Sequence, residues 1–175
     1  TTESQAGGSS PLVFDDWCGW HKDHGSLTAL LPGMLCDDEE SHGLSSTNVV
    51  GEEKGEFHST KPGLYIETRE GELVHANLSP SSLGFQLGET IQIMSRGKFR
   101  ATPHAVKAPS TAAKRVGRAS LAVFLQPEAQ QELPPLTKEN VEGLPSAGLD
   151  DRFSLEHRWR PTFGAFQKAT TEAFN

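Results

Sequence analysis

Apolar and polar residues alternate along much of the chain in short runs that end at glycine or proline turns. A period of two is typical of β-strands with one buried face, whereas an amphipathic helix repeats every 3.6 residues. Residues 69–71 form a glycine turn, which indicates a hairpin between the runs on either side of it. Because no helical pattern separates the runs, we expect a mainly β, antiparallel fold. The expected strands are residues 26–31, 63–68, 72–76, 83–87, 88–95, 100–106 and 119–125.

Two stretches lack this alternation. Residues 1–10 are small or polar and cannot bury enough apolar surface to become ordered, so we expect a disordered tail. Residues 33–62 are aperiodic and acidic, which indicates a long surface insertion within a core of residues 11–127. Long loops of this kind are either disordered or functional lids, and the acidic composition favours disorder.

The composition changes again after Pro127. Residues 128–175 contain several prolines and form a C-terminal extension to the core. Pro161 suits the first turn of a helix, where a missing amide proton is not needed. A run of aromatic residues follows it: Phe163, Phe166 and Phe174. Aromatic residues at helical spacing pack into a core more often than they contact a cofactor, so we expect a short helix that covers the barrel.

The overall composition narrows the classes of function. The chain has 175 residues, of which 35% are hydrophobic and 22% are charged, as is ordinary for one soluble globular domain. A net charge of -7 without a basic cluster argues against nucleic-acid and membrane partners. No apolar run approaches the roughly 20 residues of a membrane span, and no leader opens the chain. We therefore expect a cytoplasmic location, with Cys18 and Cys36 as thiols rather than a disulfide.

A histidine and an aspartate stand two residues apart just before the first strand. On an extended chain His21 and Asp23 point to the same side, which places an imidazole beside a carboxylate. A site of two histidines and one carboxylate binds a metal ion such as Fe(II) on one side and leaves its other positions open. The missing ligand would be a distant histidine, and His104 fits that role.

Four motifs occur in order between residues 19 and 127. They are His-x-Asp-x-Gly-x-Leu-Thr from His21, Gly-Glu-Thr-Ile-Gln-Ile-Met-Ser-x-Gly from Gly88, Thr-Pro-His-x-Val from Thr102, and Arg-x-Ser-x-x-x-Phe-x-x-Pro from Arg118. A single His-x-Asp pair is a weak signal, but four framed motifs in one order are specific. In these motifs the chain resembles the catalytic core of the isopenicillin-N-synthase-like 2-oxoglutarate and Fe(II)-dependent dioxygenases.

The resemblance implies a double-stranded β-helix, which is a jelly-roll or cupin-like architecture with two facing sheets. It implies that His21, Asp23 and His104 are the catalytic metal ligands. It also implies that Arg118 and Ser120 bind the far carboxylate of 2-oxoglutarate, to which a guanidinium fork is suited. The expected cofactors are Fe(II) and 2-oxoglutarate, with ascorbate in support, and the expected partners are O2 and a small organic substrate.

The chain departs from the family pattern at its N-terminus. The resemblance implies a helical region and a first core strand before His21, and only residues 12–14 look like a remnant of that strand. We therefore expect a fragment or processed form, with a barrel that is incomplete at the N-terminus. The tyrosine that often also reaches the 2-oxoglutarate carboxylate has no counterpart upstream.

Three functions from different classes fit these residues. The first is a 2-oxoglutarate-dependent dioxygenase that hydroxylates or desaturates its substrate and releases succinate and CO2. The second is an Fe(II)-dependent oxidase of the isopenicillin N synthase type, which uses no 2-oxo acid. The third is a non-catalytic ligand-binding jelly roll, which has no need of an open metal triad. Taken singly, each site residue also has a structural reading as a hydrogen-bonded pair, a core histidine or a surface ion pair; their joint order favours the dioxygenase.

Overall fold

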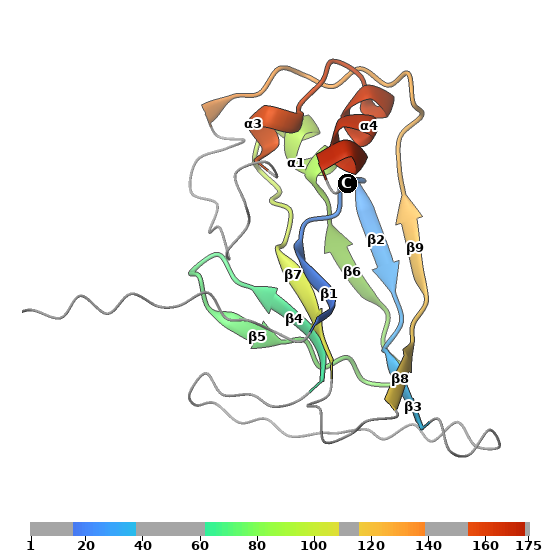
Figure 1. Ribbon diagram of the computed structural model, residues 1–175. Coiled ribbons are helices and arrows are strands. Elements are labelled where there is room, and N and C mark those ends of the chain that lie inside the picture. Colours follow the sequence, from blue (N-terminus) through green and yellow to red (C-terminus); the bar gives the residue numbers. More distant parts are fainter. Residues whose placement is uncertain (1–15, 38–61, 109–115, 139–153, 174–175) are drawn as a thin grey trace, which may run out of the picture.

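The computed structural model describes residues 16–37, 62–108, 116–138 and 154–173. Within these ranges the chain forms antiparallel sheets with helices gathered at one end (Figure 1). The first sheet has the order β1-β7-β4-β5, with β1 at Asp16–His21, β7 at His104–Lys107, β4 at Gly63–Glu67 and β5 at Leu73–His75. The second has the order β6-β2-β9, with β6 at Gly84–Leu87, β2 at Leu27–Leu30 and β9 at Ala122–Leu125. A two-stranded sheet pairs β3, Met34–Asp37, with β8, Val116–Ala119, at the other end.

Consecutive segments of the chain pass from one sheet to another, as they do in a double-stranded β-helix. β1 lies in the first sheet, β2 in the second and β3 in the two-stranded one, although the three strands follow one another directly in the sequence. All strand pairs in the described ranges are antiparallel. The fold expected from the alternating pattern, mainly β with facing sheets, is therefore confirmed.

The register of the second sheet separates two faces. Thr28 of β2 lies opposite Gln86 of β6 and Phe124 of β9, so these three residues share one face. Thr28 and Gln86 are both buried. The other face is apolar throughout and consists of Leu27, Ala29, Phe85, Leu87, Val123 and Leu125.

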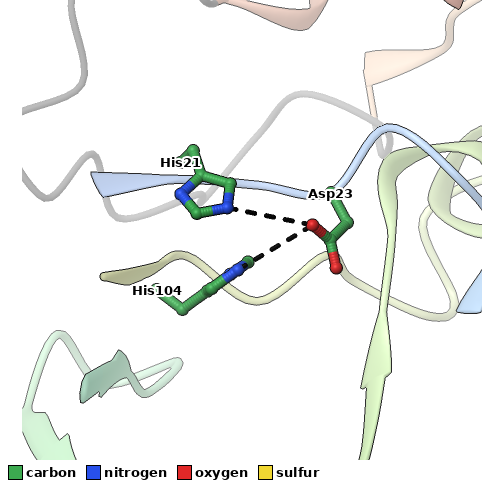
Figure 2. Close-up of side chains that lie close together, drawn as sticks. All are labelled: His21, Asp23 and His104. Atoms are coloured by element: carbon green, nitrogen blue, oxygen red, sulfur yellow. Dashed lines mark ion pairs between the residues drawn. The ribbon is translucent and has the colours of Figure 1, made fainter. Parts of the chain in front are cut away.

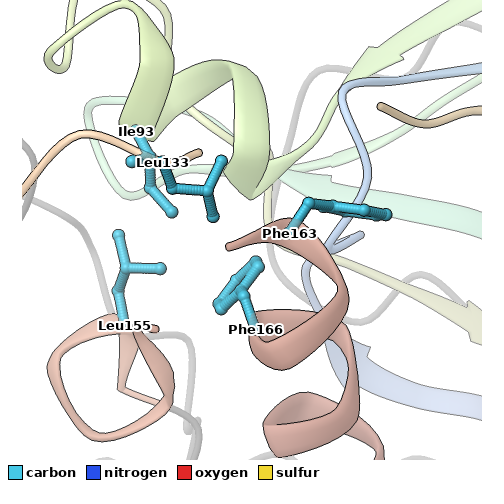
Figure 3. Packing of buried hydrophobic residues seen from close by; sticks show 5 residues of the cluster. All are labelled: Ile93, Leu133, Leu155, Phe163 and Phe166. Carbon is cyan, nitrogen blue, oxygen red and sulfur yellow. The ribbon is translucent and has the colours of Figure 1, made fainter. Parts of the chain in front are cut away.

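In the part of the chain that the structure describes, three helices form the cap at the end of the sheets. They are α1, Glu89–Met94, α3, Leu155–Arg158, and α4, Phe163–Ala173. Their buried apolar residues meet in one cluster with Leu133, which lies outside the helices (Figure 3); the helical members are Ile93, Leu155, Phe163 and Phe166. The predicted C-terminal helix is confirmed, and it packs through the aromatic residues at its start. None of the helices in the described residues has the length and apolar character needed to span a membrane.

The strand predicted over residues 88–95 is wrong, because this segment forms helix α1. Its alternating isoleucines fit a strand equally well in sequence. The helix, however, buries Glu89, Thr90 and Gln92 as well as Ile93, and these polar groups find partners elsewhere in the fold. Gln92, for example, accepts a hydrogen bond of 2.8 Å from the backbone N–H of Ala101. The segment is helical because the helix buries polar side chains that all find hydrogen-bond partners, and the alternation of its isoleucines does not reveal this.

Two boundaries also differ from the predictions. The segment 33–62 is not a loop throughout, because Met34–Asp37 forms β3 against a strand more than 75 positions further on. The predicted strand 119–125 is two strands, since β8 ends at Ala119 and β9 begins at Ala122, where the chain moves to another sheet. Short pairings between distant segments leave little periodic signal. The predicted tail 1–10, the remnant strand 12–14 and residues 38–61 of the insertion lie outside the described residues.

Candidate metal centre

Three side chains from two distant segments of the sequence meet where β1 and β7 pair. His21 is the last residue of β1, His104 is the first residue of β7, and the two are cross-strand partners. Asp23 follows β1 in the loop that leads to β2. Figure 2 shows the two imidazoles and the carboxylate pointing toward one another. The antiparallel pairing of β1 with β7 therefore brings together the three residues that the sequence singled out.

The spacing of the donor atoms fits one metal ion. Oδ1 of Asp23 lies 3.9 Å from Nε2 of His21 and 3.8 Å from Nε2 of His104. The donor atoms of all three residues lie within 4.8 Å of one another. Ligand bonds of about 2.1 Å place neighbouring donors of one ion about 3 to 4 Å apart, so an ion needs only a small contraction of this cluster. Among the described residues, this is the group of histidine, cysteine and acidic side chains with metal-binding geometry.

Backbone carbonyls orient both imidazoles toward the centre. Nδ1 of His21 lies 2.7 Å from the carbonyl oxygen of Gly19, and Nδ1 of His104 lies 3.0 Å from that of Thr102. If each Nδ1–H donates to its carbonyl, each Nε2 carries the lone pair that a metal requires. In this tautomer both lone pairs lie on the nitrogens nearest to Oδ1 of Asp23.

Burial keeps the candidate ligand His104 neutral. Burial and, to a smaller extent, the neighbouring His21 lower the pKa of His104 to about 4, although the Thr102 carbonyl and Asp23 act in the opposite direction. Burial also lowers the pKa of His21, but contacts with the Cys18 thiol and the Gly19 carbonyl outweigh it and raise that pKa above its usual value. His104 is consequently neutral at pH 7 and able to donate its lone pair.

The two oxygens of Asp23 have different surroundings. Oδ2 accepts a hydrogen bond of 2.5 Å from the hydroxyl of Thr28, and the amide nitrogen of Gln86 lies 3.5 Å from the same oxygen. Oδ1 is the oxygen that faces both histidines. Since Thr28 and Gln86 share one face of the second sheet, that sheet holds one oxygen of Asp23 and leaves the other for the ion.

Gln86 is the site residue that the sequence analysis missed. Its amide nitrogen also lies 2.5 Å from Nδ1 and 2.9 Å from Nε2 of His104, so the side chain reaches two of the three candidate ligands. The residue lies in the predicted strand 83–87 at a polar position between apolar neighbours. That position was the available signal, because a polar residue on the inward face of a strand needs a buried partner.

Arg118 and Ser120 lie together but on a different sheet from the histidines. Arg118 belongs to β8, and its Nη1 donates a hydrogen bond of 3.2 Å to the hydroxyl of Ser120. The expectation that Arg118 precedes a strand is wrong, since it lies inside one. The structure thus unites these two residues with each other, at the opposite end of the sheets from the helices (Figure 1).

The guanidinium of Arg118 is half-buried. Burial lowers the pKa of Arg118, and the charge of Cys18 on β1 acts in the opposite direction. Cys18 precedes His21 on that strand. Gly33 leaves room for the same guanidinium, because a Cβ at this position would lie 2.5 Å from Nε of Arg118.

An antiparallel β fold with a cluster of two histidines and one carboxylate defines a class of protein, one that holds a single metal ion with open coordination positions. Comparison with known proteins points to a family. Residues 55–127, a range that includes His104, Arg118 and Ser120, match the model of the 2OG-Fe(II) oxygenase superfamily. The chain is similar to this superfamily over these residues, and the name of the superfamily states the two cofactors that the sequence motifs predicted, 2-oxoglutarate and Fe(II).

Individual relatives agree with this family. Leucoanthocyanidin dioxygenase from Malus domestica is 30% identical over 113 residues, which cover 65% of this chain and 30% of that protein. The crystal structure of the dioxygenase for auxin oxidation from rice superposes with a TM-score of 0.52 at 21% identity, covering 91% of this chain and 42% of that one. A full-length Neurospora crassa protein crystallised in complex with alpha-KG and 5-formyluracil gives 0.51 at 16% identity, over 90% and 40% of the two chains. The chain thus spans less than half the length of each of these relatives.

Proposed function

We propose that the protein is a 2-oxoglutarate- and Fe(II)-dependent dioxygenase that hydroxylates or desaturates a small organic substrate. The observation that carries this proposal is the convergence of two Nε2 atoms and one carboxylate oxygen on a single point. This donor set suits Fe(II), because two neutral imidazoles and one carboxylate leave positions open for a chelating oxo acid and O2. The relatives named as dioxygenases support the same reaction class.

The cofactors supply the oxidation when bound: O2 oxidises 2-oxoglutarate to succinate and CO2 and oxidises the substrate in the same turnover. The residues of the chain provide the positions. His21, His104 and Oδ1 of Asp23 would hold the ion, and the Gly19 and Thr102 carbonyls keep both imidazoles turned toward it. Arg118 and Ser120 would hold the far carboxylate of 2-oxoglutarate through charge and hydrogen bonds.

Succinate release tests the proposal. The protein is incubated with Fe(II), ascorbate and 2-oxoglutarate in the presence of a panel of small organic metabolites, and succinate is quantified against product. We expect succinate in equal amount to oxidised product, and none from a His104→Ala variant, which lacks one of the three proposed ligands. Substrate oxidation without succinate would instead identify an oxidase that uses no 2-oxo acid. If no metabolite gives oxygen uptake or product, the result favours a ligand-binding jelly roll.

A further inference from the structure

The loop that carries Asp23 is bound along its whole backbone to the start of α1. Four consecutive carbonyl oxygens of the loop accept hydrogen bonds from the first residues of this helix. The bonds run from Glu89 N–H to Asp23 (2.7 Å), from the Thr90 hydroxyl to His24 (2.5 Å), from Thr90 N–H to Gly25 (3.1 Å) and from Gly88 N–H to Ser26 (3.1 Å). The first N–H groups of a helix have no partner within it, and here they are used to fix the metal loop.

The same end of α1 is held from its other side by the C-terminal segment. The two guanidinium nitrogens of Arg158 donate to the two carboxylate oxygens of Glu89, at 2.8 Å and 2.6 Å. Both side chains are buried, with 4% and 2% of their surface exposed. Arg158 is itself held in place, because Nη1 also lies 3.0 Å from the hydroxyl of Thr170 and the guanidinium lies over the ring of Phe166.

Arg158, Glu89 and Asp23 therefore form a continuous chain of contacts from helices α3 and α4 to the metal loop. We propose that Arg158 is a positioning residue for the metal centre, acting through Glu89 and the N-terminus of α1. The proposal rests on the proposed function of His21, Asp23 and His104 as metal ligands. It assigns a role at the site to a segment beyond residue 127, where the match to the family model ends.

The chemistry of the pair explains why Arg158 matters beyond packing. A carboxylate deprived of its buried partner either takes up a proton or moves toward water. Because the backbone N–H of Glu89 bonds the carbonyl of Asp23, movement of Glu89 displaces the residue that supplies the carboxylate ligand. Partners of this kind around metal ligands typically contribute a factor of about 10 to 100 in metal affinity.

The test compares Mn(II) affinity with fold stability. Mn(II) binding is measured by calorimetry for Arg158→Met and Arg158→Lys, at a temperature where circular dichroism shows each metal-free variant to be folded. Leu133→Ala is the reference, because it opens a cavity in the buried cluster beside Arg158 and leaves the Arg158–Glu89 ion pair intact. Arg160→Met is the matched control, since Arg160 is exposed and its hydrogen bonds to described residues go to the backbone carbonyls of His157 and Trp159. Co(II) absorption of each variant reports the geometry of the centre.

We expect Arg158→Met to bind Mn(II) about 10 to 100 times more weakly and to change the Co(II) spectrum. Arg158→Lys should lie between it and the unchanged protein, because lysine supplies the charge without the fork. Leu133→Ala should lose melting temperature yet keep its Mn(II) affinity, and Arg160→Met should keep both. If Leu133→Ala loses as much affinity as Arg158→Met for the same loss of melting temperature, the proposal is overturned.

Two further results are decisive. Should Arg158→Met not fold, Arg158→Lys carries the test, and unchanged Mn(II) affinity and an unchanged Co(II) spectrum in that variant overturn the positioning role. If the unchanged protein binds no Mn(II), the proposed function fails and the positioning role with it. A different outcome is that the unchanged protein binds Mn(II) and the Arg158 variants bind it equally well. That result overturns the positioning role alone.

Discussion

At the scale of a single residue, the two carboxylate oxygens of Asp23 have different partners and different expected roles. Thr28 and Gln86 contact Oδ2, while Oδ1 faces the two imidazoles. A carboxylate restrained in this way is suited to bind an ion through one oxygen only. One more coordination position then stays open than if both oxygens were bound, which suits a centre that must accept both an oxo acid and O2.

Arg118 provides the residue-scale prediction for the oxo acid. If its guanidinium pairs with the far carboxylate of 2-oxoglutarate, Arg118→Gln leaves that carboxylate buried and unpaired, which costs roughly 3 to 5 kcal/mol. We expect 2-oxoglutarate affinity to fall by about two to four decades, with Mn(II) affinity unchanged. The measurement is calorimetric titration of 2-oxoglutarate into the Mn(II)-loaded protein without oxygen.

The exposed Arg69 on the β4–β5 turn gives a matched control, and Arg69→Gln should alter neither affinity. Arg118→Lys should recover part of the loss, since lysine offers a point charge and no fork. Unchanged 2-oxoglutarate affinity in Arg118→Gln would remove Arg118 from the site and favour the oxidase that uses no 2-oxo acid.

The sequence pointed to the candidate ligands, which the structure brings together, but not to the residues that support them. The two-residue spacing of His21 and Asp23 and the framed His104 are local signals, and the fold brings them to one point. Arg158 carries no such signal, and Gln86 carries only its polar position between apolar neighbours. Their importance depends on partners 63 and 69 positions away, and only the packed structure shows these contacts.

At the scale of elements, the close approach of α1 to the metal loop depends on Gly88. A Cβ at this position would lie 2.1 Å from the carbonyl oxygen of Gly25 and 2.9 Å from that of Asp23. Both neighbours are backbone atoms and cannot move without displacing the loop. The helix was predicted as a strand because its isoleucines alternate, whereas these backbone contacts, which favour the helix, leave no mark on the apolar pattern.

Gly88→Ala should therefore separate α1 from the loop. We expect it to weaken Mn(II) binding by at least about tenfold, the lower end of the effect of outer partners on metal sites. Gly84→Ala on β6 is the control, because the atoms nearest to its new Cβ belong to the flexible side chains of Leu78 and Leu30. The measurement is calorimetric titration of Mn(II) into both variants. Equal Mn(II) affinities of Gly88→Ala and Gly84→Ala would show that the metal loop tolerates displacement.

At the scale of the whole molecule, the candidate metal centre lies between the helical cap and the β3–β8 pair (Figure 1). The helical cap holds the loop of Asp23 from one end, and the β3–β8 pair carries Arg118 at the other (Figure 1). The sequence predicted the antiparallel sheets and α4 from local patterns. It did not predict the β3–β8 pair, since β3 is a short run whose partner is remote.

Metal removal should lower the stability of the whole fold. An ion that binds the folded protein but not the unfolded chain stabilises it by about 2.7 kcal/mol at 100 times its Kd. For a chain of this size that corresponds to a rise in melting temperature of about 5 to 10 °C. We expect EDTA to reverse this rise in thermal unfolding followed by circular dichroism. His104→Ala should melt at the same temperature with and without Mn(II), and an equal rise in that variant would show that the ion binds elsewhere.

The bound ion would also close a ring of chain between Asp23 and His104, which lie 81 positions apart. The entropy of ring closure grows only with the logarithm of ring size, so doubling the intervening chain costs about 0.6 kcal/mol. Insertions between these two ligands should therefore hardly disturb metal binding, provided that the strands still pair. The single residue between His21 and Asp23 has no such tolerance, because one added residue would turn the two side chains to opposite sides. Length variation in this protein is thus expected to collect inside the large ring and to be absent from the small one.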